Sequence, residues 1–364
     1  MKLLVMGNNG HLGGLSVHYK TLVSNLEKEN IELFCINMND TGEKIFNNNT
    51  VTEVVVPFRP LSLFGKLKKI ILLYIAIKNA RKFRPDVFVA TSFGYGFALV
   101  ASKLPSNVFK IFQEVHFDAT ADKLRLKMVK EFDAVATQTQ GMIAAFKANV
   151  ADIKPVYFLP CFSKDYHAQG FKEIPGTAHG IKIAYFGRLA WNKGLQEFIS
   201  FTAAIFHGNI TLKLDIYGGG SEQQHIQKEI DDQNLNNQIT LKGFYSDDEF
   251  PVLITDYHAV ILPSIATEGL PLILIEAMRF GRPVFTTTTG AMPEIGEINK
   301  KGMLVSEKDK TSMEANFGTF IAALNEGNFD AAYINDIYAK NFSNEAFKNI
   351  WLRMLNDPKR YFSN

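Results

Sequence analysis

Two carboxylates that could bind the two ends of one ligand stand close together in residues 263–297. Glu268 and Glu276 are eight positions apart, and a Gly-Leu-Pro sequence followed by an apolar run separates them. The pattern predicts a buried helix that begins at Pro271, whose fixed φ suits a first turn, and ends at Gly281. Glu268 would lie in the loop before this helix, and Glu276 about five residues into it. Because a helix N-terminus favours negative charge, the arrangement suits a ligand with a central diphosphate and hydroxyl-rich sugars at both ends.

Two cations, Arg188 and Lys193, lie in a second segment that could do chemistry, between a predicted strand and a predicted helix. Cleavage of a sugar–phosphate bond leaves extra negative charge on the departing phosphate, and preorganised cations stabilise that charge more in the transition state than in the ground state. Arg188 can bind two oxygens with its planar guanidinium, whereas Lys193 acts as a point charge. In isolation both side chains would be ordinary solvated residues, but their place after a strand favours a functional role.

The elements that must position these groups follow from an alternation of short apolar runs and helical patterns, which is typical of βαβ units and parallel sheets. In the first half we expect strands at Leu3–Met6, Ile31–Ile36, Val51–Val56, Val87–Ala90, Val108–Glu114, Ala134–Thr137 and Val156–Leu159. In the second half we expect strands at Ile181–Phe186, Lys213–Tyr217, Ile239–Leu241, Ala259–Leu262 and Val284–Thr287. Helices are expected at Leu15–Lys28, Gly194–Phe206, Glu222–Asp232 and Asn344–Leu355. Gly170, Pro175 and Gly176 interrupt the pattern near residues 164–180, so the sequence predicts an α/β fold with two doubly wound halves.

Composition indicates a soluble globular protein without a disulfide framework. The 364 residues suffice for two domains, and 46% are hydrophobic and 21% charged. Cys35 and Cys161 have no metal-ligand spacing and fit a reducing compartment. The first apolar run breaks at Gly7, too early for a secretory signal, and the run from Ile70 to Ile77 is far too short to span a bilayer. We expect a cytoplasmic protein with no metal, no cofactor and no nucleic-acid partner.

The segment around the two glutamates resembles the signature of glycosyltransferase family 4, whose members are retaining, nucleotide-sugar-dependent enzymes with the GT-B fold. The spacing of Glu268 and Glu276, the Gly-Leu-Pro after the first and the Glu-Ala-Met around the second all match. Gly290–Ile295 is similar to the family's Gly-Gly-x-Pro-Glu turn, with Ala291 in place of one glycine. The loop with Arg188 and Lys193 looks like the family's Gly-Arg-Leu…Lys-Gly loop.

The resemblance implies two Rossmann-like domains facing across a cleft. Residues 1–165 would bind the acceptor and residues 166–342 the nucleotide-sugar, while 343–364 would form a helix that crosses back to the first domain. Glu276 would accept hydrogen bonds from the ribose. Glu268 would bind hydroxyls of the transferred sugar and stabilise positive charge at its anomeric carbon. The catalytic positions it assigns are Glu268, His116, Arg188 and Lys193. The donor-binding positions it assigns are Gly13, Gly14, Gly187, Gly218, Phe244, Gly269, Leu270, Pro271, Leu272 and Glu276.

Some of these positions have weaker support from the sequence. Gly13 and Gly14 could simply form a turn, and the glycines after residue 217 are mainly a turn signal. His116 follows a predicted strand at the end where ligands bind in open α/β sheets, although a lone histidine is often structural. The family's Pro-Asn-Gly-Val-Asp at the end of the first domain is replaced here by Pro160-Cys161-Phe162-Ser163-Lys164 and Asp165. This departure concerns the hinge and not the donor site.

Residues 61–84 are both apolar and basic. Residues 1–163 carry 20 Lys and Arg against 13 Asp and Glu, a net charge of +7. Seven of these 20 cations lie in residues 61–84. One interpretation is contact with an anionic membrane that presents a lipid-linked acceptor. The alternative is a sheet-covering helix with a basic outer face.

The sequence thus predicts a retaining, metal-independent hexosyltransferase that uses a UDP- or GDP-sugar as co-substrate. The acceptor would be a glycan or lipid-linked glycan, in cell-surface polysaccharide synthesis. Three alternatives stay open: a sugar-nucleotide epimerase or a phosphorylase with the same fold, and a non-catalytic nucleotide-binding protein. The base, the sugar, the acceptor and the oligomeric state are not specified by the sequence.

Overall fold

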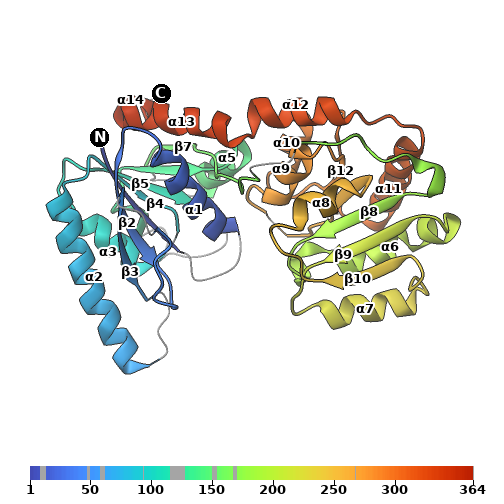
Figure 1. Cartoon of the computed structure of the whole chain (residues 1–364), viewed down its shortest axis with the longest axis horizontal. Coiled ribbons are helices and arrows are strands. Elements are labelled where there is room, and N and C mark those ends of the chain that lie inside the picture. Colours follow the sequence, from blue (N-terminus) through green and yellow to red (C-terminus); the bar gives the residue numbers. More distant parts are fainter. Residues whose placement is uncertain are drawn as a thin grey trace. The chain divides into compact units, whose positions relative to one another are not determined.

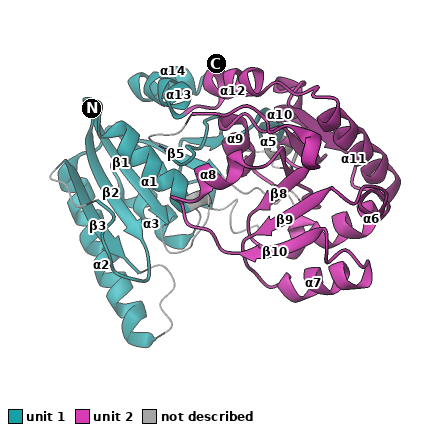
Figure 2. Ribbon diagram, turned by 45° about the vertical axis from the view of Figure 1, so that its right-hand side comes forward, with its two compact units in different colours: residues 1–165, 344–364 teal, residues 166–343 magenta. Residues whose placement is uncertain are grey.

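The chain folds into two compact units, each built around its own parallel sheet (Figure 2). Unit 1 comprises Met1–Asp165 and Asn344–Asn364, and unit 2 comprises Tyr166–Ser343. The computed structural model describes residues 1–8, 14–46, 50–57, 62–92, 94–114, 128–149, 154–166, 170–266 and 268–363.

In the described residues of unit 1, seven parallel strands have the order β3-β2-β1-β4-β5-β6-β7 (Figure 1). The strands are β1 (Lys2–Asn8), β2 (Glu32–Met38), β3 (Val51–Val56), β4 (Val87–Ala90), β5 (Phe109–Glu114), β6 (Ala134–Thr137) and β7 (Val156–Phe158). The helices are α1 (Gly14–Leu26), α2 (Leu63–Phe83), α3 (Tyr95–Lys103), α5 (Gln140–Asn149), α13 (Asn344–Asn356) and α14 (Pro358–Tyr361). Strands β1 and β4 are buried on both faces, which explains why they are continuous apolar runs.

The last two helices of the chain are part of unit 1. The Trp351 indole of α13 is fully buried and donates to the Pro160 carbonyl at 2.9 Å, and the Tyr361 hydroxyl of α14 donates to the Phe158 carbonyl at 2.7 Å. Trp351 lies beside the buried imidazole of His18. His18 Nδ1 accepts from the Phe162 N–H at 3.0 Å, so Nε2 carries the proton and donates to Gln113 Oε1 at 2.7 Å.

In the described residues of unit 2, six parallel strands have the order β10-β9-β8-β11-β12-β13 (Figure 1). The strands are β8 (Lys182–Phe186), β9 (Lys213–Tyr217), β10 (Ile239–Gly243), β11 (Ala259–Leu262), β12 (Val284–Thr287) and β13 (Met303–Ser306). The helices are α6 (Leu195–Gly208), α7 (Gln223–Asp232), α8 (Phe250–Thr255), α9 (Leu272–Arg279), α10 (Met292–Ile298), α11 (Lys310–Asn325) and α12 (Ala331–Asn341), and short 3₁₀ turns lie at η1 (Thr177–His179) and η2 (Trp191–Lys193). The strand order reverses between β8 and β11, and ligands of open α/β sheets bind beside such a point.

The predicted α/β class with two doubly wound sheets is confirmed. Strands at Val51–Val56, Val87–Ala90, Ala134–Thr137, Lys213–Tyr217, Ala259–Leu262 and Val284–Thr287 have the expected bounds. Pro271 is a small correction, because it is the N-cap of α9, with extended backbone at φ −66° and ψ 117°, and not the first helical residue. Strand β13, which pairs with β12, was not predicted.

Candidate active site at the carboxyl end of the second sheet

The candidate site of unit 2 is formed by the loops that follow strands β8, β9, β10, β11 and β12. Backbone hydrogen bonds join these loops directly. The Gly187 N–H donates to the Tyr217 carbonyl at 3.1 Å, and the Gly218 N–H donates to the Gly243 carbonyl at 2.7 Å. The Ile265 N–H donates to the Asn192 carbonyl at 3.0 Å, which ties the β11 loop to the β8 loop. The site therefore rests on a hydrogen-bonded backbone frame.

Glycines allow these loops to come so close. Gly218 has φ +127°, and a Cβ there would lie 1.8 Å from the Gly187 carbonyl oxygen. Gly194, at φ +64°, would place a Cβ 2.2 Å from the Pro263 oxygen. No side chain fits at such distances, so both positions require glycine. The contact at Gly194 sets the distance between the loop that carries Lys193 and the loop that carries Glu268.

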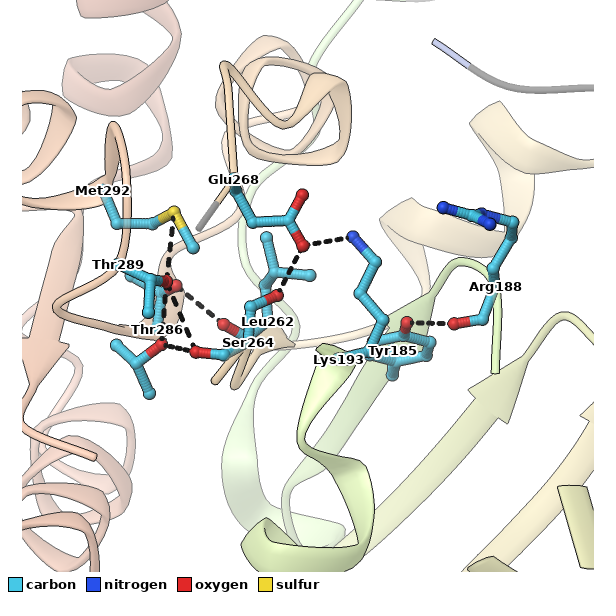
Figure 3. Close-up of polar contacts among 10 residues, drawn as sticks. Tyr185, Arg188, Lys193, Leu262, Ser264, Glu268, Thr286, Thr289 and Met292 are labelled. Atoms are coloured by element: carbon cyan, nitrogen blue, oxygen red, sulfur yellow. Dashed lines mark hydrogen bonds and ion pairs between the residues drawn. The ribbon is translucent and has the colours of Figure 1, made fainter. Parts of the chain in front are cut away.

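Lys193 and Glu268 meet in a buried ion pair, 75 positions apart in the sequence (Figure 3). Lys193 Nζ lies 2.5 Å from Glu268 Oε1, and the side chains are 14% and 9% exposed. Ser264 Oγ donates to the same carboxylate oxygen at 2.9 Å. Figure 3 shows the second carboxylate oxygen of Glu268 pointing away from both donors. The carboxylate is thus held in one orientation, with one oxygen engaged by the protein and one directed elsewhere.

The backbone of Ser264 is held by strand β12 and the turn that follows it. Its carbonyl accepts from Thr287 Oγ1 at 2.5 Å and from Thr289 Oγ1 at 3.3 Å (Figure 3). Sequence reasoning assigned no role to Ser264. It is the first hydroxyl residue after the apolar strand β11, at the end of the sheet where ligands bind, and this position was a usable signal.

Gly290 supports Glu268 through the backbone. It has φ +54°, and a Cβ there would lie 1.8 Å from the Glu268 carbonyl oxygen. A side chain at residue 290 would therefore displace the loop that carries the carboxylate.

Arg188 is exposed at the start of the β8 loop, and its backbone is held by a buried tyrosine. The Tyr185 hydroxyl donates to the Arg188 carbonyl at 2.8 Å. Burial raises the pKa of Tyr185, and the negative charge of Glu268 raises it further, while Arg188 opposes the shift. Tyr185 hence stays a neutral donor. In Figure 3 the guanidinium of Arg188 and the ammonium of Lys193 extend from the loop in the same direction.

Glu276 is the fifth residue of α9 and lies among aromatic side chains. The Tyr166 hydroxyl donates to Glu276 Oε1 at 3.1 Å, and Arg279 holds the Tyr166 carbonyl at 2.5 Å and lies over its ring. Burial and then the Glu276 charge raise the pKa of Tyr166, and the same two causes raise that of Tyr245. Tyr166 was missed at the sequence level because 110 positions separate it from Glu276.

The remaining predicted donor positions of unit 2 lie on the same loops. Gly269 and Leu270 are buried, and Pro271, the N-cap of α9, and Leu272, its first residue, are half-buried. Phe244 is 85% exposed after β10, and a Cβ on Gly219 would lie 2.4 Å from its ring. The structure therefore gathers these positions with Gly187, Gly218, Lys193 and Glu268 at one edge of the sheet.

Only one of the three predicted site positions of unit 1 lies within the described residues. Gly14 is the first residue of α1, while Gly13 and His116 lie outside the described residues. Within the described ranges, no group of three or more His, Cys, Asp or Glu side chains could hold a metal ion.

Comparison with known proteins assigns a class to this architecture. Residues 172–334 match the family model of glycosyl transferases group 1. The structure of HepE from Anabaena in complex with UDP superposes with a TM-score of 0.77 at 16% identity and covers 98% of this chain and all of that one. The lipopolysaccharide outer core galactosyltransferase WaaB gives 0.73 at 16% identity over 98% of this chain and 99% of that one. The fold is GT-B, as in these solved structures, and the match to the glycosyl transferases group 1 model lies within unit 2.

Curated relatives match over shorter segments. WcaL of Salmonella typhimurium, a glycosyltransferase named for colanic acid biosynthesis, is 30% identical over 154 residues, which are 41% of this chain and 38% of WcaL. The poly(ribitol-phosphate) alpha-N-acetylglucosaminyltransferase of Staphylococcus aureus is 27% identical over 59% of this chain and 41% of its own length. In both cases the match spans less than half of the relative.

Proposed function

We propose that the protein is a retaining glycosyltransferase that moves a hexose-type sugar from a UDP- or GDP-sugar to a hydroxyl of a glycan or lipid-linked glycan. The observation that carries this proposal is the buried pair of Lys193 and Glu268 beside the start of α9, with Arg188 on the same loop as Lys193. Relatives named for polysaccharide biosynthesis support this role, and structures of similar fold bound to UDP make UDP the first nucleotide to test.

In the proposed reaction, the bond between the anomeric carbon and the β-phosphate oxygen breaks while the acceptor hydroxyl attacks from the same face. The acceptor proton passes to the departing phosphate oxygen, so the products are the glycoside and the nucleoside diphosphate. Arg188 and Lys193 would stabilise the charge that develops on the diphosphate. The free oxygen of Glu268 would face the sugar and stabilise its positive charge, and Glu276 would accept from the ribose.

The first experiment is a thermal-shift panel with UDP, GDP and ADP and their common sugars. A nucleotide at 100 times its Kd should stabilise the protein by ~2.7 kcal/mol. A shift with one base names the donor class, and the absence of any shift contradicts the proposal. Transfer is then assayed in the presence of EDTA with the matching nucleotide-sugar, and the anomeric configuration of the product is determined by NMR.

Two variants test the assigned roles, and the co-substrate requirement separates the proposal from its alternatives. Arg188→Ala and Glu276→Ala should each lower transfer, because they remove groups that hold the diphosphate and the ribose. Unchanged transfer rates in both variants would contradict the assigned roles. An epimerase would release sugar and nucleotide without an acceptor, a phosphorylase would require phosphate and a glucan, and a non-catalytic protein would bind the donor without consuming it.

A further inference from the structure

Helix α2 of unit 1 packs on its sheet through a narrow face of small and apolar residues. Leu73, Ala76 and Ala80 recur at three- and four-residue spacing and are at most 6% exposed. They belong to the unit 1 core, and the helix contacts β2, β3 and α3. In Figures 1 and 2 the first turns of α2 extend past the ends of the strands. The start of the helix therefore has solvent on most of its circumference.

The opposite face of α2 is also apolar over its first three turns. The exposed residues there are Leu63 (85%), Phe64 (78%), Leu67 (55%), Ile70 (65%), Ile71 (51%), Tyr74 (68%) and Ile75 (40%). Single exposed apolar residues are ordinary, but an uninterrupted set on one helix marks a binding surface. The helix covers the sheet, as the alternative expects, and its outer side over these residues is apolar with exposed lysines beside it. We call the exposed side of residues 63–75 the apolar face of α2.

Positive charge surrounds and continues the apolar face. Lys66 and Lys68 are exposed beside it, and Lys78, Arg81 and Lys82 extend the same outward side through the last turns. The sequence from residue 62 to residue 84 contains no acidic residue. An exposed apolar surface on a helix whose charged side chains are all cations matches the chemistry of a bilayer with anionic headgroups, because apolar side chains enter the acyl boundary while the cations stay at the phosphates.

We propose that the apolar face of α2 docks unit 1 onto an anionic lipid bilayer. Leu63, Phe64, Leu67 and Ile71 would insert below the headgroups, and Lys78, Arg81 and Lys82 would contact the anionic lipid. The helix lies on the surface, and within the described part of the chain no helix combines the length and hydropathy needed to cross a bilayer. This docking does not involve the nucleotide site of unit 2, so the membrane proposal and the proposed glycosyl transfer can be tested separately.

The test is vesicle co-sedimentation of the full chain. Vesicles of phosphatidylglycerol and phosphatidylcholine in equal amounts should bind the protein, and vesicles of phosphatidylcholine alone should bind it at least about tenfold more weakly. High salt should weaken binding to the anionic vesicles, because it screens the cations. Equal sedimentation with both vesicle types, or no binding to either, would overturn the proposal.

Two pairs of variants separate the apolar and the basic contributions. F64E/I71E should reduce binding at least about tenfold, whereas Ile210→Glu, at a 76% exposed position of unit 2, should not change it. K78A/R81A/K82A should lose binding to anionic vesicles, whereas K228A/K300A/K340A removes the same charge from exposed sites of unit 2 and should retain it. Equal effects of a variant and its control would also overturn the proposal.

Three further measurements complete the test. F64E/I71E should keep the wild-type far-UV circular dichroism spectrum, which shows that unit 1 is folded, and the nucleotide-dependent thermal shift, which shows that unit 2 is folded. Size-exclusion chromatography with light scattering then compares the oligomeric state of F64E/I71E with that of the wild type. If the wild type is a stable dimer that does not bind vesicles and F64E/I71E is a monomer, a second copy of the chain covers this face and the membrane proposal is wrong.

Discussion

Replacement of Lys193 by Met should destabilise unit 2 by leaving Glu268 buried and unpaired. The pair is 2.5 Å long and at most 14% exposed, so water cannot replace the lost ammonium. Removing one partner of such a pair costs about 3–5 kcal/mol, and the remaining bond from Ser264 places the expected loss near about 3 kcal/mol. For a domain of this size, that loss lowers Tm by about 6–12 °C. Met keeps the apolar stem of the side chain, so packing contributes little to the change.

The double variant K193M/E268Q distinguishes the ion pair from a general loss of packing. A neutral amide has no buried charge, and it can still accept from Ser264, so stability should recover by about 2 kcal/mol relative to K193M. Transfer should stay at least about 100-fold below wild type in both variants, because neither restores the cation at the diphosphate.

This stability is measured by calorimetry, from the unfolding transition of unit 2, which is identified by its shift when nucleotide is added. Lys300→Met is the matched control. Lys300 pairs with Glu297 at 2.8 Å, but both side chains are exposed, so no measurable change is expected. If K193M loses no more stability than K300M, or if E268Q makes the double variant worse, the two side chains are not energetically coupled and the assigned architecture of the site is wrong.

Three other predictions follow from the same structure. Tyr166→Phe removes the hydroxyl that donates to Glu276 but keeps the ring, so calorimetric titration should show UDP binding weakened about fivefold with stability nearly unchanged; unaltered affinity would exclude a positioning role. Burial lowers the pKa of His18 from 6.5 to about 4, so below pH 6.5 the unfolded chain takes up a proton that the folded chain does not. Urea unfolding should therefore show a loss of about 3 kcal/mol between pH 6.5 and 4 that His18→Gln lacks, and parallel pH profiles would contradict it. Gly290→Ala should lower kcat strongly by displacing Glu268. Gly327→Ala is the control, because Gly327 has φ +69° and no neighbour within 4 Å, so the substitution brings similar backbone strain without a clash and should keep kcat. Equal activities of the two variants would refute the claim that the Gly290 contact positions Glu268.

The elements of this chain were predictable where local pattern alone decides them. Strands β4 and β11 are short apolar runs because both of their faces are buried, and Pro283 marks the start of β12. Strand β13 escaped prediction because its apolar run is only three residues long, Met303 to Val305, between Gly302 and Ser306. The GT-B class followed from the motif around Glu268, which no amount of periodicity would have supplied.

The contacts inside the site were less predictable, because they join residues that are distant in the sequence. Nothing near Glu276 indicates that Tyr166 would reach it, and nothing near Lys193 indicates that its ammonium would meet Glu268 and not solvent. Of the glycines that permit these contacts, Gly187 and Gly218 were assigned to donor binding through the family resemblance, and none was recognised for its close approach to another backbone. Their second property, the absence of a Cβ at a point where another backbone passes, depends on the tertiary structure.

The departure from the family pattern at Ala291 illustrates this distinction. In this chain, one glycine of the family's Gly-Gly pair is replaced by alanine. The sequence does not show which of the two positions requires glycine. In the structure, Gly290 has φ +54° and touches the Glu268 backbone, whereas Ala291 has φ −77° and ψ −13° and is the N-cap of α10. Residue 291 therefore needs neither a left-handed conformation nor a close approach, and its Cβ is buried without strain. The requirement for glycine lies at residue 290 alone, so the substitution at 291 leaves the support of Glu268 intact.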